Sequence, residues 1–283
     1  MALVAKPAGP TSHDVVDIAR RALGTRRVGH LGTLDPMAEG LLVLVVGRAT
    51  RLAPFAAGWS KRYEGTMRLG TATSTDDATG ELLTTSDAWQ SMDRAQVSAA
   101  LGRFLGVQEQ LPPAHSAVKV GGERAYRRAR RGETVALAPR PVEVHSLELV
   151  EFAPPDVRFR ATVSAGTYLR GLARDVGTAL ACGAHLAALR RTAVGPFELQ
   201  DAVAPDAVTP ASLRDPAVLV AHLPRHDLTS AEREAAVHGR PIENRESGQG
   251  ERGMVALFSE GRLVAVAEAV GEALKPRVVV SDA

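Results

Sequence analysis

The sequence has a single cysteine, Cys182, among its 283 residues. One thiol excludes an intramolecular disulfide framework and a zinc site built from several thiolates. The chain also lacks a signal-peptide hydrophobic region and any run of about 18 apolar residues, so we expect a cytoplasmic protein without a membrane span. Hydrophobic residues make up 45% and charged residues 23%, which is typical of an ordinary globular protein.

Lysine is scarce, with four lysines against thirty arginines, although the formal net charge is only +2. Because guanidinium groups bind phosphate through two hydrogen bonds and stack on bases, this bias suits RNA binding. A GC-rich genome produces the same bias whatever the function, so clustering is better evidence. Five arginines lie between Arg124 and Arg131, with Tyr126 among them. Since Glu123 and Glu133 are the only acids nearby, we expect this cluster to contact an RNA backbone.

The most informative segment is GHLGTLDPMAEG, which runs from Gly29 to Gly40. Its glycines allow sharp turns or a close approach to a ligand, and Pro36 favours an extended backbone at Asp35. The apolar run at residues 41–46 then predicts a buried strand. The pattern places the Asp35 carboxylate in a loop at the mouth of that strand, where catalytic groups often lie. Taken alone, an aspartate before a proline more often forms an Asx turn.

This segment resembles the active-site signature of the bacterial tRNA pseudouridine-55 synthases, the tRNA pseudouridine synthase B family. Further blocks follow the order of that family and extend the resemblance over roughly the first 200 residues, the size of one large domain. Two positions depart from the pattern, since His115 replaces a common aromatic and Ser74 a common aspartate. The blocks are Lys6-Pro7-x-Gly9-x-Thr11-Ser12, Lys61-Arg62-Tyr63, Leu69-Gly70, Thr75-Asp76-Asp77-x-x-Gly80, Pro112-Pro113-x-His115-Ser116-Ala117-x-Lys119, Gly166-Thr167-Tyr168-x-Arg170 and Cys182-Gly183-Ala184-His185-x-x-x-Leu189-Arg190-Arg191.

The resemblance implies an α+β fold, in which a mixed, largely antiparallel sheet is flanked by helices. Local patterns are compatible with this fold: apolar residues alternate at 61–69 and 157–163, as in strands, and follow a helical stripe after Thr11. Helical patterns also predict helices over residues 88–105 and 169–180.

Two domains are expected. Residues 1–222 would form the pseudouridine synthase catalytic domain. Residues 223–283 contain a predicted helix near 230–238 and three short predicted strands, at 254–258, 263–268 and 277–280. This tail resembles a small PUA-type RNA-binding β domain, and its small size predicts that it docks on the first domain.

The resemblance assigns roles to five side chains. Asp35 matches the catalytic aspartate, and Arg170 matches the arginine that pairs with this carboxylate. Tyr63 matches the tyrosine that packs under the flipped base and is placed to handle the C5 proton. His30 matches the histidine beside the vacated position in the RNA, and Tyr168 would support Asp35 and the base. Whether Asp35 attacks the sugar or the base, or takes a ribose proton, stays open.

A second set of residues is expected to bind RNA. Lys6 either contacts the RNA or braces the Asp35 loop. A single histidine and a single aspartate in the 29–40 segment make a weak metal site, so we expect neither a metal nor another cofactor. The remaining expected RNA-binding residues are Arg124, Arg127, Arg128, Arg131 and Arg190. Arg190 and Arg191 together are expected to form a second, smaller basic site.

The implied reaction is the isomerisation of uridine to pseudouridine at position 55 in the TΨC loop of tRNAs. It exchanges an N1–C1′ bond for a C5–C1′ bond, which requires a carboxylate, a proton route at C5 and extraction of the base from its stack. The expected partner is the T-arm stem-loop, bound by a monomer without a guide RNA. Three alternatives stay open: a synthase of guide-RNA particles, an RNA glycosylase, and a non-catalytic tRNA-binding or folding factor.

Overall fold

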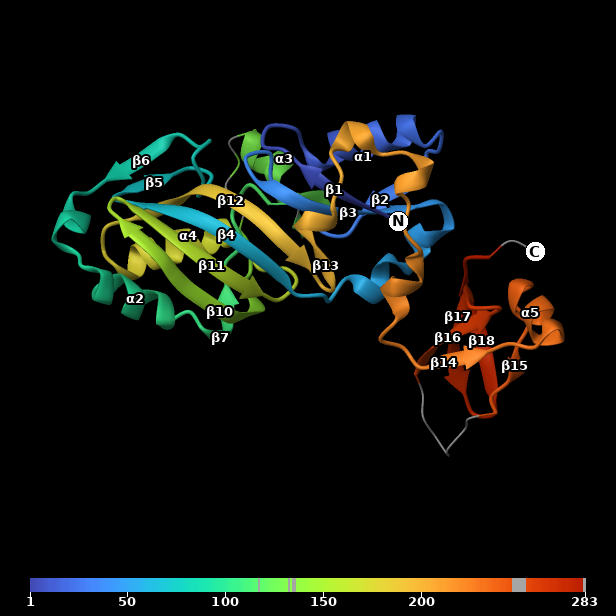
Figure 1. The fold of residues 1–283 in the computed structure, drawn as a ribbon. Coiled ribbons are helices and arrows are strands. Elements are labelled where there is room, and N and C mark those ends of the chain that lie inside the picture. Colours follow the sequence, from blue (N-terminus) through green and yellow to red (C-terminus); the bar gives the residue numbers. More distant parts are fainter. Residues whose placement is uncertain (117, 132, 134–135, 246–252, 282–283) are drawn as a thin grey trace.

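A nine-stranded sheet organises the chain up to residue 198 in the computed structural model, which describes residues 1–116, 118–131, 133, 136–245 and 253–281. The strand order is β1-β3-β12-β4-β11-β10-β7, with β2 beside β3 and β13 beside β12 (Figure 1). The strands are β1 (Ala2–Lys6), β2 (Val28–His30), β3 (Glu39–Val46), β4 (Lys61–Leu69), β7 (Gly106–Gln110), β10 (Arg140–Ala153), β11 (Asp156–Val163), β12 (Ala184–Val194) and β13 (Phe197–Glu198).

The pairing within this sheet is mixed. Strands β3 and β12 run parallel, and the other pairs are antiparallel. The expected α+β fold with a largely antiparallel sheet is therefore confirmed. Two small hairpins lie beside the sheet: β5 (Thr71–Thr73) with β6 (Leu82–Thr85), and β8 (Lys119–Val120) with β9 (Glu123–Arg124).

Local capping signals fix where the helices begin. The first helix begins after Thr11, because the Thr11 hydroxyl accepts a hydrogen bond from the Asp14 amide and the Asp14 carboxylate accepts one from the Thr11 amide. The expected helix over residues 88–105 is wrong in its first part, because Asp93 forms the same kind of box with Gln96. The α-helices are α1 (Ser12–Ala22), α2 (Arg94–Gly102), α3 (Ala125–Arg130), α4 (Leu169–Ala179) and α5 (Ser230–Val237). The 3-10 helices are η1 (Gly47–Ala56), η2 (Ala88–Ser91), η3 (Leu199–Asp201), η4 (Pro205–Ala207), η5 (Pro210–Ser212) and η6 (Pro216–Val220).

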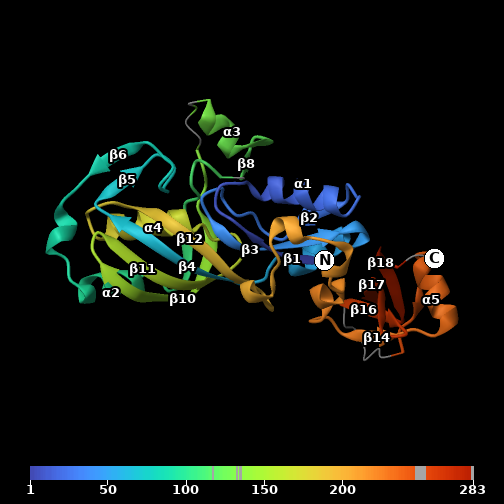
Figure 2. The same ribbon diagram turned by 45° about the horizontal axis from the view of Figure 1, so that its top comes forward.

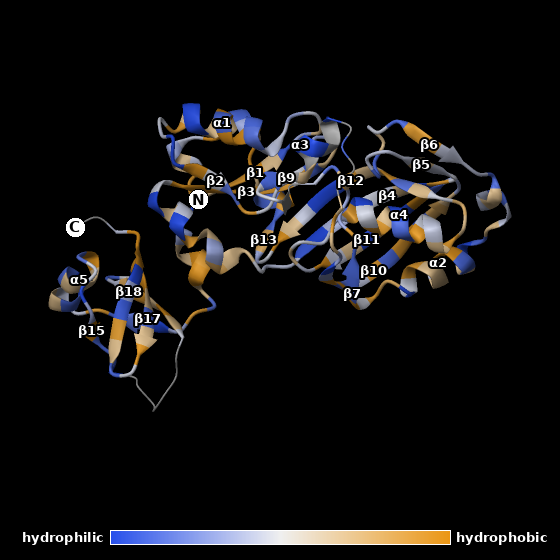
Figure 3. Cartoon of the chain, turned by 180° about the vertical axis from the view of Figure 1, so that it is seen from behind, coloured by the Kyte–Doolittle hydropathy of each residue, from blue (hydrophilic) through white to orange (hydrophobic). Residues whose placement is uncertain are grey.

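The two faces of the central strands differ. Helix α4 lies on one face (Figure 3), where Leu172 and Val176 share an apolar core with Tyr63 and Met67 of β4. On the opposite face, none of the helices that the structure describes crosses β4, β11 and β12 (Figure 1). In Figure 2, α3 projects away from the sheet beyond β8. None of the described helices is long and apolar enough to cross a membrane.

A second sheet follows near the C-terminal end, with the order β14-β16-β17-β18-β15. Its strands are β14 (Arg225–Asp227), β15 (Ile242–Glu243), β16 (Met254–Ser259), β17 (Arg262–Val270) and β18 (Ala273–Val279). The expected last strand, 277–280, begins too late, because β18 continues through Pro276. The unit docks on the rest of the chain: Leu263 and Val266 share an apolar core with Leu41, and the Arg51 guanidinium donates to the Val279 carbonyl at 3.1 Å.

Candidate active site

Buried polar side chains bind the backbone of the loop that carries Asp35. Ser12, at the start of α1, donates its hydroxyl to the Leu34 carbonyl at 2.9 Å and accepts a bond from the Leu34 amide at 2.8 Å. The Lys6 ammonium donates to the carbonyls of Pro36 at 3.3 Å and Ala38 at 2.6 Å, as well as to the carbonyl that follows it in the chain. Lys6 is buried, and this burial lowers its pKa to about 8. Of the two roles considered, Lys6 therefore braces the loop.

The same loop is held from the side by Arg191 of β12. This guanidinium is fully buried and donates to the carbonyls of Leu41 at 2.7 Å and Gly32 at 3.0 Å. At Gly40 a Cβ atom would lie 2.3 Å from the Arg191 carbonyl oxygen, and the residue has φ +110°, so only glycine fits. The sequence grouped Arg191 with Arg190 as a second, smaller basic site, whereas the structure buries Arg191 against these carbonyls.

Arg170 and Asp35 form a bidentate ion pair at the N-terminus of α4. The guanidinium donates through Nε to Oδ2 at 2.8 Å and through Nη2 to Oδ1 at 3.1 Å. The Arg170 side chain is 5% exposed, whereas the Asp35 side chain is 35% exposed. Such a fork-shaped pair fixes the orientation of the carboxylate while leaving part of it accessible. The structure thus brings together the two residues that the resemblance paired.

A second carboxylate, Asp77, lies behind Arg170. Its Oδ2 is 3.5 Å from Arg170 Nε, and its Oδ1 accepts bonds from the hydroxyls of Thr75 at 2.7 Å and Thr79 at 2.6 Å. The Thr75 and His115 carbonyls accept the other Arg170 bonds, at 2.8 and 2.9 Å. The contact uses the main chain of His115, so it does not require a particular side chain at this position.

Sequence reasoning missed Asp77. It quoted this residue in the Thr75-Asp76-Asp77 block without a role, although adjacent acids among threonines in a polar turn are a usable signal. Asp76 has a positive φ of 60°, and its carboxylate binds Arg174 of α4 at 3.0 Å. Burial raises the pKa of Asp76. Within the described part of the chain, no three His, Cys, Asp or Glu side chains are grouped to hold a metal ion.

Two tyrosines lie on the α4 side of the sheet. Tyr63 of β4 is buried and belongs to the apolar cluster that includes Leu34 and Leu189. Tyr168 precedes α4 and is half-buried, and this burial raises the pKa of its phenol. Tyr63 therefore belongs to the same side of the sheet as α4, and Tyr168 precedes Arg170 by two residues.

His30 lies at the end of β2, at the start of the loop. Its ring meets the ring of His13 edge-on, with 6.4 Å between centroids. Its Nδ1 is buried without a hydrogen-bond partner among the residues that the structure describes. Burial lowers the pKa of His30, and the nearby charges of His13 and Arg191 lower it further. A neutral imidazole is therefore favoured at this position.

The arginine cluster on and around α3 is partly neutralised. Arg131 donates to Glu123 at 2.7 and 2.8 Å and to Glu133 at 2.7 Å, and Arg128 donates to Glu133 at 2.8 Å. The expectation that the two acids leave the cluster unpaired is therefore wrong for Arg128 and Arg131. Arg127 is exposed, and no ion pair joins it to the described residues.

The side chain of Arg124, a further expected RNA contact, lies outside the described residues. Arg190 is described, and it is separated from Tyr63 and Arg170. In the β4–β12 pair, Tyr63 lies opposite Arg191 and Glu64 lies opposite Arg190, so Glu64 and Arg190 face away from α4.

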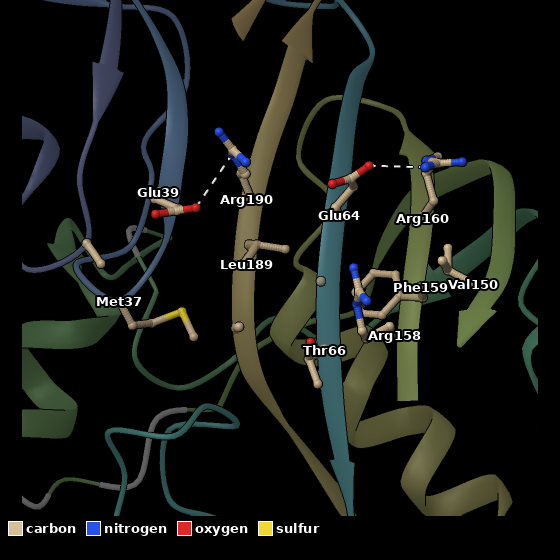
Figure 4. A pocket seen from close by; sticks show the side chains of 13 residues that line it. Met37, Glu39, Glu64, Thr66, Val150, Arg158, Phe159, Arg160, Leu189 and Arg190 are labelled. Carbon is tan, nitrogen blue, oxygen red and sulfur yellow. Dashed lines mark hydrogen bonds and ion pairs between the residues drawn. The ribbon is translucent and has the colours of Figure 1, made fainter. Parts of the chain in front are cut away.

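Arg190 lines a cleft of about 400 Å³ on this far face of the sheet (Figure 4). Its guanidinium lies 3.5 Å from Glu39, and Arg160 lies 3.2 Å from Glu64. Arg158, which also lines the cleft, pairs with Glu151 at 2.6 Å. Each of these three arginines has a carboxylate partner, so their positive charge at the cleft is partly compensated.

Comparisons with known proteins place these features in a family. The family model "TruB family pseudouridylate synthase (N terminal domain)" matches residues 20–169, and "tRNA pseudouridylate synthase B C-terminal domain" matches residues 170–223. The tRNA pseudouridine synthase B of Thermobifida fusca is 48% identical over 98% of this chain and 97% of that protein. The protein of the same name from Mycobacterium leprae is 45% identical over 98% of this chain and 89% of its own length.

A similar fold is found among solved structures. A chain in the crystal structure of a Cbf5-Nop10-Gar1 complex has a TM-score of 0.73 and 26% identity, covering 99% of this chain and 85% of that chain. The matches to the family models and to the two bacterial relatives extend over the Asp35 loop, the Asp77 turn and the start of α4. The chain belongs to the TruB family of pseudouridylate synthases.

Proposed function

We propose that this protein converts uridine to pseudouridine at position 55 in the TΨC loop of tRNAs, as a cytoplasmic enzyme that acts without a guide RNA. The observation that carries the proposal is the bidentate pair of Arg170 with a partly exposed Asp35. The buried guanidinium donates to both carboxylate oxygens, so it holds the carboxylate in one orientation. Membership of the pseudouridylate synthase family supports this chemistry.

The reaction breaks the N1–C1′ bond, forms the C5–C1′ bond, and transfers the C5 proton away while N1 gains one. Asp35 is the only member of the Asp35–Arg170–Asp77 group with substantial exposure, so it is the group that meets the nucleotide. Arg170 and Asp77 stay buried behind it and hold its position. Attack on C1′, attack on the base and removal of a ribose proton all use the same placement of the carboxylate.

The uridine has to leave its stack to reach Asp35, at a cost of a few kcal/mol. In our proposal Tyr63 packs under the flipped base and is placed near the C5 proton, and Tyr168 supports the base from the start of α4. A neutral His30 then occupies the space that the base has vacated. The low pKa of His30 supports this role, because a neutral ring stacks in an apolar site without the cost of burying a charge.

Recognition of the T-arm is assigned to Arg127 and its neighbours around α3, where exposed positive charge remains. We also propose that residues 1–222 form the catalytic domain and residues 223–283 a PUA-like RNA-binding domain. The identity of 48% to a bacterial tRNA pseudouridine synthase B exceeds the 26% to the chain in the Cbf5-Nop10-Gar1 complex. This difference favours a tRNA enzyme that works without a guide RNA over a component of a guide-RNA particle. We propose that it works as a monomer.

The test is to incubate the purified protein with a tRNA transcript and locate pseudouridine by carbodiimide labelling and primer extension. We expect one stop, at position 55, and none with a transcript that carries cytidine there. Modification at another position would refute the site assignment. Binding without any modification would favour the alternative of a tRNA-binding or folding factor.

A further inference from the structure

We propose that Gln110, the last residue of β7, is a positioning residue that sets the start of α4 and, through it, Tyr168 and Arg170. The proposal rests on the pseudouridine synthase function proposed above and adds a residue to its machinery. Gln110 is 5% exposed, and its side chain acts on the active site through other residues.

The side-chain amide of Gln110 binds both backbone groups of Tyr168. Gln110 Nε2 donates to the Tyr168 carbonyl at 3.0 Å, and the Tyr168 amide donates to Gln110 Oε1 at 2.8 Å. The side-chain amide of Gln110 thus makes the two hydrogen bonds that the backbone of a neighbouring strand would otherwise make with Tyr168. Tyr168 has an extended backbone, with φ −100° and ψ 111°, and its own side chain makes no capping bond to α4. The helix therefore begins at a residue that Gln110, rather than a capping side chain, holds in place.

The first turn of α4 transmits this constraint to the catalytic pair. The Tyr168 carbonyl also accepts the first helical bond, from the Leu172 amide at 3.0 Å. The amide of Gln110 packs closely on this turn, because a Cβ at Gly171 would lie 3.3 Å from its Cδ and Nε2. Arg170 lies between these contacts. A shift of the Tyr168 backbone would therefore move the guanidinium that orients the catalytic carboxylate.

The segment that follows Gln110 contacts the same helix twice more. Arg174 Nη2 donates to the Leu111 carbonyl at 2.9 Å, and Arg170 Nη2 donates to the His115 carbonyl at 2.9 Å. Three points of the segment 110–115 are thus bonded to α4 or to the residue before it. Gln110 is the only one of the three that uses a side chain, so a point substitution can remove its contact cleanly.

The test compares Gln110→Met with Gln108→Met. Methionine has nearly the length of glutamine and removes the amide, while Gln108 lies in the same strand and donates to the Phe104 carbonyl at 2.6 Å. We expect Gln110→Met to lower the single-turnover rate of pseudouridine formation by about ten- to a hundred-fold, since small misplacement of catalytic groups has this effect. The dissociation constant for the T-arm should stay within about two-fold. Gln108→Met should leave both quantities within about two-fold of wild type.

A second readout requires no turnover. The chain has three tyrosines, so the ¹³Cζ resonance of Tyr168 can be assigned through Tyr168→Phe in protein labelled at tyrosine. The pH at the midpoint of the titration of this resonance should differ from the wild-type value in Gln110→Met and should equal it in Gln108→Met.

The proposal would be overturned if Gln110→Met had the wild-type single-turnover rate and the wild-type Tyr168 resonance. Equal loss of rate in Gln110→Met and Gln108→Met would also overturn it. Absence of pseudouridine with the wild-type protein would overturn the proposed function instead. In that case a resonance shift confined to Gln110→Met would still support the positioning of Tyr168.

Discussion

The guanidinium of Arg170 lies between two carboxylates, binding Asp35 at 2.8 and 3.1 Å and lying 3.5 Å from Asp77. The two acids differ in access, because the Asp77 side chain is 6% exposed and the Asp35 side chain 35%. Asp77 is further fixed by the Thr75 and Thr79 hydroxyls. The buried Asp77 therefore holds Arg170, and Arg170 holds Asp35, the acid proposed to react.

Asp77→Asn should slow pseudouridine formation at least about ten-fold, because the neutral amide holds Arg170 less firmly and the pair with Asp35 rearranges. The free energy of unfolding should fall by about 1–3 kcal/mol, the cost of leaving buried hydrogen-bonding groups unpaired. Single-turnover kinetics and urea unfolding measure the two effects. Asp87→Asn, at an exposed position, is the matched control. An Asp77→Asn variant with the wild-type rate would show that Asp77 is dispensable.

The arginines around α3 should contribute unequally to RNA binding. Arg127→Gln should reduce the slope of log Kobs against log salt by about one, as expected for one lost phosphate contact. Arg131→Gln should reduce it less, because Glu123 and Glu133 already pair with Arg131. Titrations of the T-arm at several salt concentrations give the slopes. A larger effect of Arg131→Gln, or no effect of either change, would contradict this assignment.

The pKa of His30 predicts a dependence of stability on pH. Burial lowers this pKa below its ordinary 6.5, so the unfolded chain binds more protons than the folded chain between the folded value and 6.5. Stability is therefore lost as the pH falls through that window. His30→Asn should lose less free energy of unfolding than wild type between about pH 7.5 and 5. The exposed His222→Asn variant should follow the wild type, and equal losses in all three proteins would refute the prediction.

The parts of the fold that sequence predicted are those with local signals. The Thr11–Asp14 box marks the start of α1, and alternation of apolar residues marks β4 and β11. The predicted helix at 88–105 began too early because its apolar pattern outweighed the Asp93–Gln96 box, which is equally local. The sequence established no strand order, since nothing local shows that β12 lies between β3 and β4.

The contacts of the candidate site, like the strand order, have few local signals in the sequence. Arg170 alone has the pattern of an exposed helical charge, and only the resemblance to a family paired it with Asp35. Gln110 binds a residue 58 positions away, and Arg191 binds a carbonyl 150 positions away, so no local pattern shows either contact. Side chains alternate along β12, so Arg190 and Arg191 must lie on opposite faces of the sheet. Which of the two faces the core is known only once the strand is placed in the sheet.

The most direct test of the central claim is release of tritium from C5-labelled uridine in a T-arm transcript, with wild type beside Asp35→Asn. The account predicts release by wild type, with the base still attached to the RNA. Asp35→Asn should release none while its dissociation constant for the RNA stays within about three-fold of wild type, since the substitution removes the reacting group and not the binding surface. Release by Asp35→Asn at the wild-type rate would contradict the account.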